Sequence, residues 1–167
     1  MNIERPRIKV PLQHIDIVID LASIALLLIM WGLFIRVYGD LPEEVPTHFS
    51  ASGQVDGYGS KASLWFLPGL ATFIYIGIFL LNRYPHLHNY MVNITEENAF
   101  KQYQFSTRML RIVNFLCVLM FAYILYRLIA TIEGNAIGLG DLFLYIVLGL
   151  SLAIPIVFII LQKRITK

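Results

Sequence analysis

The chain has few of the features that a soluble enzyme or a disulfide-stabilised secreted protein needs. Only 14% of its 167 residues are charged and 57% are hydrophobic, whereas a typical soluble domain carries about 25% charged residues. This leaves too little polar surface for a soluble globular domain. The single cysteine, Cys117, lies inside an apolar run, so no intramolecular disulfide can form. The formal net charge of +2 is too small to indicate nucleic acid as a partner.

Motifs for catalysis and cofactor binding are also missing from the sequence. It has no Gly-rich phosphate loop, no nucleophile elbow and no His-Glu-x-x-His metal motif. His86-x-His88 offers two imidazoles, but without a carboxylate or thiol beside them they make a weak metal site. We therefore interpret both histidines as solvated loop residues. We expect no metal and no cofactor, and a non-enzymatic protein.

Four apolar runs are each long enough to cross a bilayer as a helix, which takes about 20 residues. They are residues 15–37, 62–81, 109–131 and 141–161. Strand-like alternation is absent from all four, which argues against a transmembrane β-barrel. The sequence thus predicts an all-α polytopic membrane protein, a bundle of four transmembrane helices in a lipid bilayer.

The basic residues indicate how the four helices are oriented. Ten of the 13 Lys and Arg residues fall in the N-terminal tail, in the region 82–111 and in the C-terminal tail. The other three are Arg36, Lys61 and Arg127. Since Lys and Arg are enriched in cytoplasmic segments, we expect both termini in the cytoplasm and a bacterial cytoplasmic (inner) membrane as the location. The first apolar run is too long for a cleaved signal peptide and is predicted to be a retained anchor.

This orientation divides the chain into three parts. They are a cytoplasmic tail (1–14), a membrane module (15–131) with an outer loop (38–61) and an inner loop (82–108), and a fourth helix with its tail (132–167). In the inner loop, Asn93 or Thr95 is predicted to cap a helix whose first turn carries Glu96 and Glu97. Residues 85–108 are a candidate surface for a cytoplasmic partner.

The outer loop contains an unusual density of residues that fix backbone shape. Pro42 and Pro46 hold its entry extended, while Gly53 and the Asp56-Gly57 pair favour turns. We therefore expect an ordered extracytoplasmic loop after the first helix. In the functional interpretation His48 and Asp56 contact each other in one binding site. In the alternative, Asp56 caps a turn and His48 is solvated.

The same loop carries a family resemblance. The pattern Leu-Pro-x-x-Val-Pro-x-His-Phe-x-x-x-Gly-x-x-Asp-Gly, with a lysine then opening a helix, resembles the DUF 1648 family of bacterial membrane proteins. The inner-loop stretch from Pro85 to Tyr103 is similar to the corresponding stretch of many members. The family includes immunity proteins of the SdpI type, which protect bacteria from a secreted membrane-active peptide. The outer-loop residues that we regard as binding candidates are Pro42, Pro46, His48, Phe49, Gly53, Asp56, Gly57 and Lys61.

Charged residues also lie at the edges of the spans. Asp16 and Asp20 are spaced i, i+4 near the inner end of the first helix, and Arg108 and Arg111 are spaced i, i+3 near that of the third. Such groups are costly at the hydrocarbon edge unless they are paired or hydrated. A proton or cation relay is one interpretation, but we favour an interhelical charge clamp, and we predict that Arg127 pairs with Glu133 or Asp141 at the outer end.

Three functions are compatible with the sequence. The first is a membrane protein that senses or neutralises an extracellular peptide or envelope component, as SdpI-type proteins do. The second is a small transporter or channel subunit working as a homo-oligomer, although the spans hold few polar groups, chiefly Asn114 and Ser151. The third is an outer-leaflet enzyme using His48 and Asp56, which lacks a recognisable nucleophile.

Overall fold

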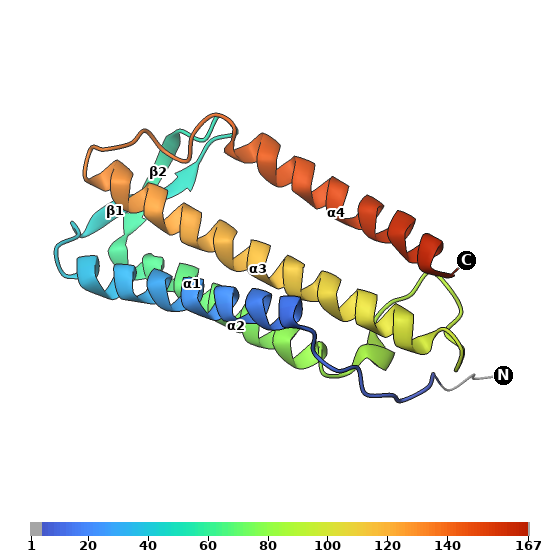
Figure 1. Cartoon of the computed structure of the whole chain (residues 1–167). Helices are drawn as coiled ribbons and strands as arrows, with labels where there is room; N and C mark the ends of the chain where they lie inside the picture. Colours follow the sequence, from blue (N-terminus) through green and yellow to red (C-terminus); the bar gives the residue numbers. More distant parts are fainter. Residues whose placement is uncertain (1–4, 167) are drawn as a thin grey trace.

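The computed structural model describes residues 5–166 and has four long helices and one β-hairpin (Figure 1). The chain runs α1 (His14–Tyr38), β1 (Glu44–Phe49), β2 (Val55–Ser60), the 3-10 helix η1 (Lys61–Trp65), α2 (Phe66–Leu81), the short 3-10 helix η2 (Pro85–Leu87), α3 (Ala99–Ile132) and α4 (Phe143–Thr166). Four helical segments in this part of the chain, with η1 counted into the second, are long and apolar enough to cross a membrane. The prediction of a polytopic four-helix bundle is confirmed, and the chain is a multi-pass membrane protein.

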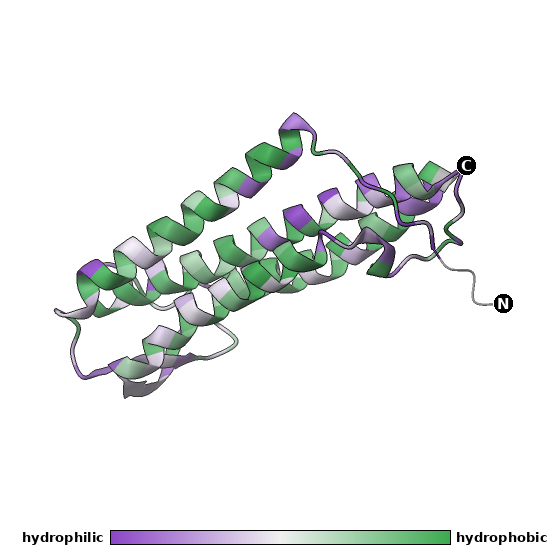
Figure 2. Cartoon of the chain, turned by 90° about the horizontal axis from the view of Figure 1, so that it is seen from below, coloured by the Kyte–Doolittle hydropathy of each residue, from purple (hydrophilic) through white to green (hydrophobic). Residues whose placement is uncertain are grey.

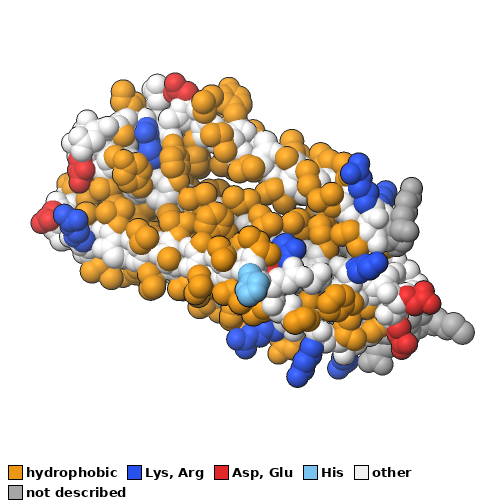
Figure 3. Space-filling model, viewed as in Figure 1, with side chains coloured by type: hydrophobic (Ala, Val, Ile, Leu, Met, Phe, Trp, Pro, Cys, Tyr) orange, Lys and Arg blue, Asp and Glu red, His pale blue; other side chains and the backbone are white. Residues whose placement is uncertain are grey.

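The bundle has two distinct ends. The hairpin lies at one end with the connection from α3 to α4, and the N- and C-terminal segments lie at the other with the connection from α2 to α3 (Figure 1). We call these the hairpin end and the terminal end. Apolar side chains dominate the middle of the helices, whereas Lys and Arg gather mainly at the terminal end of the face shown (Figures 2 and 3).

Helices α1, α2 and α3 share the main core. Its buried side chains include Met30 and Phe34 of α1, Ala71 of α2, and Val118 and Leu125 of α3. An aromatic group beside it joins α1 to the start of α2, with the Phe34 and Trp65 rings 4.9 Å apart. In the same region the Trp31 indole donates a hydrogen bond to Thr72. The hairpin is thus attached to this core at both ends, because β1 follows α1 after residues 39–43 and β2 leads directly into η1.

Helix α4 packs against α3 far more loosely. Figure 1 shows it beside α3, on the side away from α1 and α2. No residue in its most apolar stretch is buried. Its described ring contacts to α3 are the stacked pairs Tyr123–Phe143 and Phe105–Phe158, one toward each end. Most of the α4 surface therefore faces lipid.

One boundary differs from the sequence-based expectation. Helix α3 begins at Ala99 with Asn98 as its N-cap, so neither Asn93 nor Thr95 caps it and Glu96 and Glu97 precede its first turn. The reason is local: the Asn98 side chain accepts a hydrogen bond from the Thr95 backbone N–H and donates one to the Asn93 carbonyl. These bonds hold the preceding residues in a turn rather than a helix.

Candidate functional site

The outer loop forms a two-stranded antiparallel hairpin. In the ladder Val45 lies opposite Gly59, and Pro46 lies opposite Tyr58. The register shifts on both sides of His48, which pairs with Gly57. A Cβ atom at residue 57 would lie 2.9 Å from the His48 Cβ, so a glycine here lets the histidine cross the opposite strand closely. Sequence reasoning anticipated an ordered loop but not strands, because Pro and Gly are depleted in them.

His48 and Asp56 meet on the exposed side of this hairpin. The His48 Nδ1 atom lies 2.5 Å from the Asp56 Oδ1 atom, and 74% and 45% of the two side chains are exposed. The structure thus brings together the two residues that the sequence singled out as a shared site. Because the pair is open to solvent, it is available to a ligand from outside the bundle.

Lys61 closes the base of the hairpin against the bundle. Its ammonium group lies 2.8 Å from Glu43 and donates a longer bond, 3.4 Å, to the Leu41 carbonyl. It also lies 5.6 Å from the centre of the Tyr38 ring. Only 19% of the Lys61 side chain is exposed. The lysine therefore joins the end of α1 to the start of α2, and its role is to position the hairpin.

The tip of the hairpin docks on the connection between α3 and α4. Gly53 has φ +77° and Gly138 has φ +56°, a region that favours glycine. The Leu139 backbone N–H donates to the Gly53 carbonyl at 2.7 Å. A Cβ atom at residue 53 would lie 2.5 Å from the Gly140 carbonyl oxygen. Only glycines allow the two loops to approach this closely.

Two α3 side chains hold this connection in place. Arg127 donates to the carbonyls of Gly138 at 2.8 Å and Ile137 at 3.2 Å, and the Tyr123 hydroxyl donates to Leu139 at 2.8 Å. The predicted pairing of Arg127 with Glu133 or Asp141 is wrong. The loop turns two backbone carbonyls toward the guanidinium instead, and these accept from its Nε and Nη2 atoms.

Four carboxylates lie on the hairpin or in the segment that leads into it, and we call them the rim of the hairpin. The acidic residues here are Asp40, Glu43, Glu44 and Asp56, and all four are exposed. Lys61 pairs with Glu43 and is mostly covered. The exposed rim is therefore negative and favours a cationic ligand.

At the terminal end, the predicted acidic and basic pairs of α1 and α3 face each other. Arg108 Nε donates to Asp16 at 2.8 Å, and Arg111 Nε donates to Asp20 at 3.0 Å. Arg108 also donates to the Gln13 side chain. Only 5% of the Asp16 side chain is exposed. The two ion pairs thus join α1 to α3 at the terminal end of the bundle.

The inner loop packs against the helix ends, and the structure corrects the interpretation of His88. This side chain is buried, with Nδ1 2.8 Å from the Ser106 hydroxyl and Nε2 3.1 Å from the Leu81 carbonyl. Since the Leu81 carbonyl only accepts, Nε2 carries the proton and the Ser106 hydroxyl donates to Nδ1 in the neutral ring. His88 is thus a packed structural residue. Among residues 5–166 no cluster of three His, Cys, Asp or Glu side chains could hold a metal ion.

The N-terminal segment lies over the same loop. Arg5 donates to the carbonyls of His86 at 3.0 Å and His88 at 2.6 Å, and it stacks over the Tyr90 ring. Burial raises the pKa of Tyr90 to about 12, and its hydroxyl donates to the Pro85 carbonyl. Sequence reasoning missed this arrangement. The clustered aromatic residues of the loop were the only signal that it could pack.

Stability should depend on pH through His88. Burial lowers the pKa of His88, so the folded protein favours the neutral ring and protonation favours unfolding. This contribution is complete above the ordinary pKa of about 6.5 and is lost as the pH falls toward the lowered value. We expect the melting temperature to fall between about pH 7 and about pH 5.

His88→Gln should flatten this part of the profile, whereas His14→Gln, at an exposed residue, should leave it unchanged. A profile that His88→Gln does not alter would contradict this assignment.

Comparisons with known proteins find a family model and one relative. A family model described as a domain of unknown function, DUF1648, matches residues 25–72. An uncharacterised protein of Archaeoglobus fulgidus is 32% identical over 149 residues, which cover 83% of this chain and 80% of that protein. No solved structure is significantly similar to the chain. The segment matched by the family model contains the hairpin together with the adjoining parts of α1 and α2.

Proposed function

This chain belongs to the DUF1648 family, and we propose that it is a non-enzymatic membrane protein whose hairpin recognises an extracellular peptide. The observation that carries the proposal is that the family segment consists of the hairpin and the helix parts that hold it. In this proposal the hairpin faces outward from the cytoplasmic membrane, and both termini lie in the cytoplasm. Sensing or neutralising a membrane-active peptide, as SdpI-type proteins do, is the function that fits this arrangement best.

The surface chemistry of the hairpin supports a cationic peptide. Its rim carries the exposed carboxylates, with Asp56 and Glu44 on the strands themselves. A two-stranded sheet also offers strand edges to which an extended peptide can add by main-chain hydrogen bonds. Tyr58, 63% exposed on β2, supplies an aromatic surface for the side chains of the ligand. Peptides that act on membranes commonly carry Lys and Arg opposite an apolar face.

The structure offers a physical route from the hairpin to the other side of the membrane. The tip binds the connection held by Arg127 and Tyr123 of α3. Within this one helix, Ser106 lies 21 residues before Arg127, about 30 Å away at 1.5 Å per residue, and there it makes the buried contact with His88. Binding of a ligand to the hairpin would thereby change the packing of the inner loop. A cytoplasmic partner that binds the inner loop would respond to this change.

A photo-crosslinking experiment tests recognition while the ligand is still unidentified. We would place a photoreactive phenylalanine at Tyr58, or at Ile137 as an exposed control outside the hairpin, in the full chain in living cells. The proposal expects a peptide-sized adduct at position 58 that mass spectrometry identifies. Asp56→Asn should weaken it, and Asp141→Asn, an exposed acid outside the hairpin, should not. Equal adducts at both positions, or none at 58, would count against the proposal.

A binding titration then tests the charge preference. The full chain in neutral-lipid nanodiscs is titrated with a Lys-rich amphipathic peptide and with its Glu-rich counterpart. We expect saturable binding of the Lys-rich peptide only, weakened severalfold by Glu44→Gln with Asp56→Asn, since rim charges mainly affect association. Identical binding of both peptides would exclude a cation-selective rim.

A further inference from the structure

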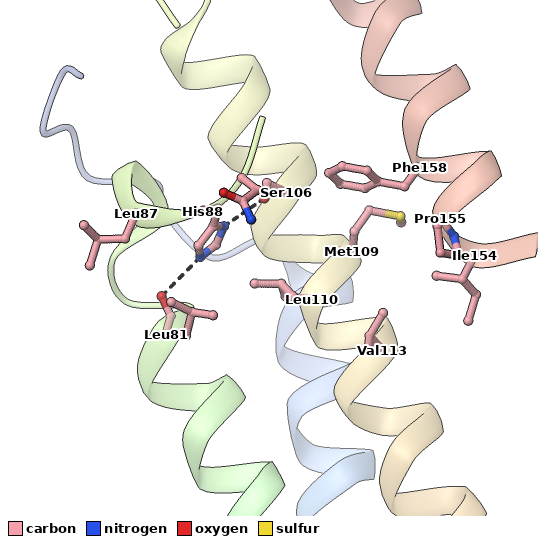
Figure 4. A pocket seen from close by; sticks show the side chains of 11 residues that line it. Leu81, Leu87, His88, Ser106, Met109, Leu110, Val113, Ile154, Pro155 and Phe158 are labelled. Carbon is pink, nitrogen blue, oxygen red and sulfur yellow. Dashed lines mark hydrogen bonds between the residues drawn. The ribbon is translucent and has the colours of Figure 1, made fainter. Parts of the chain in front are cut away.

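A cavity lies between α3, α4 and the inner loop at the terminal end. Its volume is about 350 Å³, which is within the range of small-ligand sites. Leu110 and Val113 of α3 and Ile154 and Phe158 of α4 form apolar walls, and the inner loop closes one side (Figure 4). His88, Asn89 and Ser106 give this side a polar border. The cavity thus has an apolar body and a polar end, like an amphiphile.

The position of the cavity along the helices places its body in the hydrocarbon. Its α3 lining runs from Ser106 to Val113, about 10 Å along the helix axis, compared with about 15 Å for one leaflet of the hydrocarbon core. Leu81 and Leu87 at its border are 41% and 61% exposed. The cavity therefore communicates with the bilayer beside it, where acyl chains are the surrounding medium.

The contacts that attach α4 to the rest of the molecule explain why this space exists. Toward the terminal end, Gln162 accepts a hydrogen bond from the Met91 backbone N–H at 3.1 Å, and the Phe105 and Phe158 rings stack 5.4 Å apart. Toward the hairpin end, Phe143 stacks on Tyr123. The helix thus contacts α3 and the inner loop near its ends, and the cavity lies between these contacts, with Val113 and Ile154 among its lining residues. The side chains that line the cavity lack the dispersion contacts that facing protein atoms would provide. A ligand that fills the cavity would supply these contacts.

The charges near the polar border suit an anionic headgroup. Arg83 follows the end of α2, and Lys163 and Arg164 lie in the last turn of α4, all three exposed. The Asn89 amide, exposed at the border, is a further donor. Basic groups close to the membrane surface attract the headgroups of anionic lipids. Arg83 follows the lining residue Leu81 by two positions, and Lys163 follows Phe158 by five, so these basic residues come just after the α2 and α4 parts of the lining in the sequence.

We propose that this cavity binds one acyl chain of an anionic phospholipid, with the phosphate held by Arg83, Asn89 and the α4 residues Lys163 and Arg164. The acyl chain of the lipid fills the space between α3 and α4, and its headgroup bridges α4 to the inner loop. The lipid then acts as a further connection between these elements, in addition to the contacts of Gln162 and the Phe105–Phe158 stack. This proposal does not depend on recognition of a peptide by the hairpin.

Native mass spectrometry of the full chain tests the proposal directly. The protein is purified in detergent and exchanged against phosphatidylglycerol and phosphatidylcholine with identical acyl chains. We expect one retained phosphatidylglycerol. Ile154→Trp should reduce retention roughly tenfold or more by filling the cavity, and Ile156→Trp, at an exposed residue of the same helix, should preserve it. Retention unchanged by Ile154→Trp would overturn the site, and a lipid-free dimer disrupted by Ile154→Trp would assign the surface to a second copy instead.

Charge variants test the headgroup half of the proposal. Lys163→Gln with Arg164→Gln should reduce the preference for phosphatidylglycerol roughly tenfold or more, the combined effect of two basic residues. Arg36→Gln, an exposed residue at the hairpin end of α1, should leave the preference intact. A melting curve for each variant separates lipid loss from unfolding. Equal retention of the two lipids by the unmodified chain would overturn the assignment of an anionic headgroup.

Discussion

Replacing Arg108 with glutamine should destabilise the folded protein by about 3 kcal/mol, because it leaves a buried carboxylate without its counter-ion. The Asp16 side chain is 5% exposed and that of Arg108 is 29% exposed. The two single substitutions should therefore differ: Asp16→Asn leaves an arginine that can still reach water, and should cost less. The double variant Asp16→Asn with Arg108→Gln should be more stable than Arg108→Gln alone.

A double-mutant cycle on the melting temperature measures this coupling. We expect a coupling free energy on the order of 1–3 kcal/mol for residues in direct contact. Lys101→Gln removes the same charge from an exposed residue of α3, and should change stability by no more than about 0.5 kcal/mol. Additive effects of the two single substitutions would show that the ion pair does not hold α1 to α3.

Substituting alanine for Gly138 should release the hairpin tip from the α3–α4 connection. A Cβ atom at residue 138 would collide with the Gly53 carbonyl oxygen, which accepts the Leu139 hydrogen bond. We expect a loss of about 1–3 kcal/mol from this overlap, in addition to about 1–2 kcal/mol for a left-handed backbone with a side chain. Hydrogen exchange should rise in residues 50–54 as the tip separates.

Gly134 provides a matched control for the cost of placing a side chain on a left-handed backbone. Gly134 has φ +76°, but a Cβ atom there would meet nothing within 4 Å. Gly134→Ala should therefore show the conformational cost alone, without altered exchange in the hairpin. Gly53→Ala disrupts the same contact as Gly138→Ala, so the double variant should cost less than the sum. Equal effects of Gly134→Ala and Gly138→Ala would mean that the tip does not dock.

The parts of the fold that depend on local pattern could be predicted from the sequence. The four spans follow from the lengths of the apolar runs. Residues at i, i+3 and i, i+4 share a helix face, and that rule grouped Asp16 with Asp20 and Arg108 with Arg111. The choice of partner helix needed only the knowledge that both pairs lie near the same membrane surface.

The remaining parts depend on contacts between distant segments. Docking of Gly53 on residues 138–140 joins loops more than eighty positions apart, and nothing in either loop alone specifies its partner. The burial of His88 likewise follows from the way the inner loop folds against Leu81 and Ser106. A histidine in a polar loop is expected to be solvated until that packing is known. Arg127 was assigned a carboxylate because the sequence does not show that backbone carbonyls would turn toward it.

The orientation of the hairpin is the claim on which recognition of an extracellular ligand depends. Ten of the 13 Lys and Arg residues lie in the segments assigned to the cytoplasm, which predicts that the hairpin faces outward. Cysteines are introduced one at a time at the exposed residues Ser52, in the hairpin, and Asn93, in the inner loop, in a Cys117→Ala background. A membrane-impermeant maleimide applied to intact cells should label position 52 and leave position 93 unlabelled until the membrane is opened. Labelling of position 93 with protection of position 52 would place the hairpin in the cytoplasm and contradict the account.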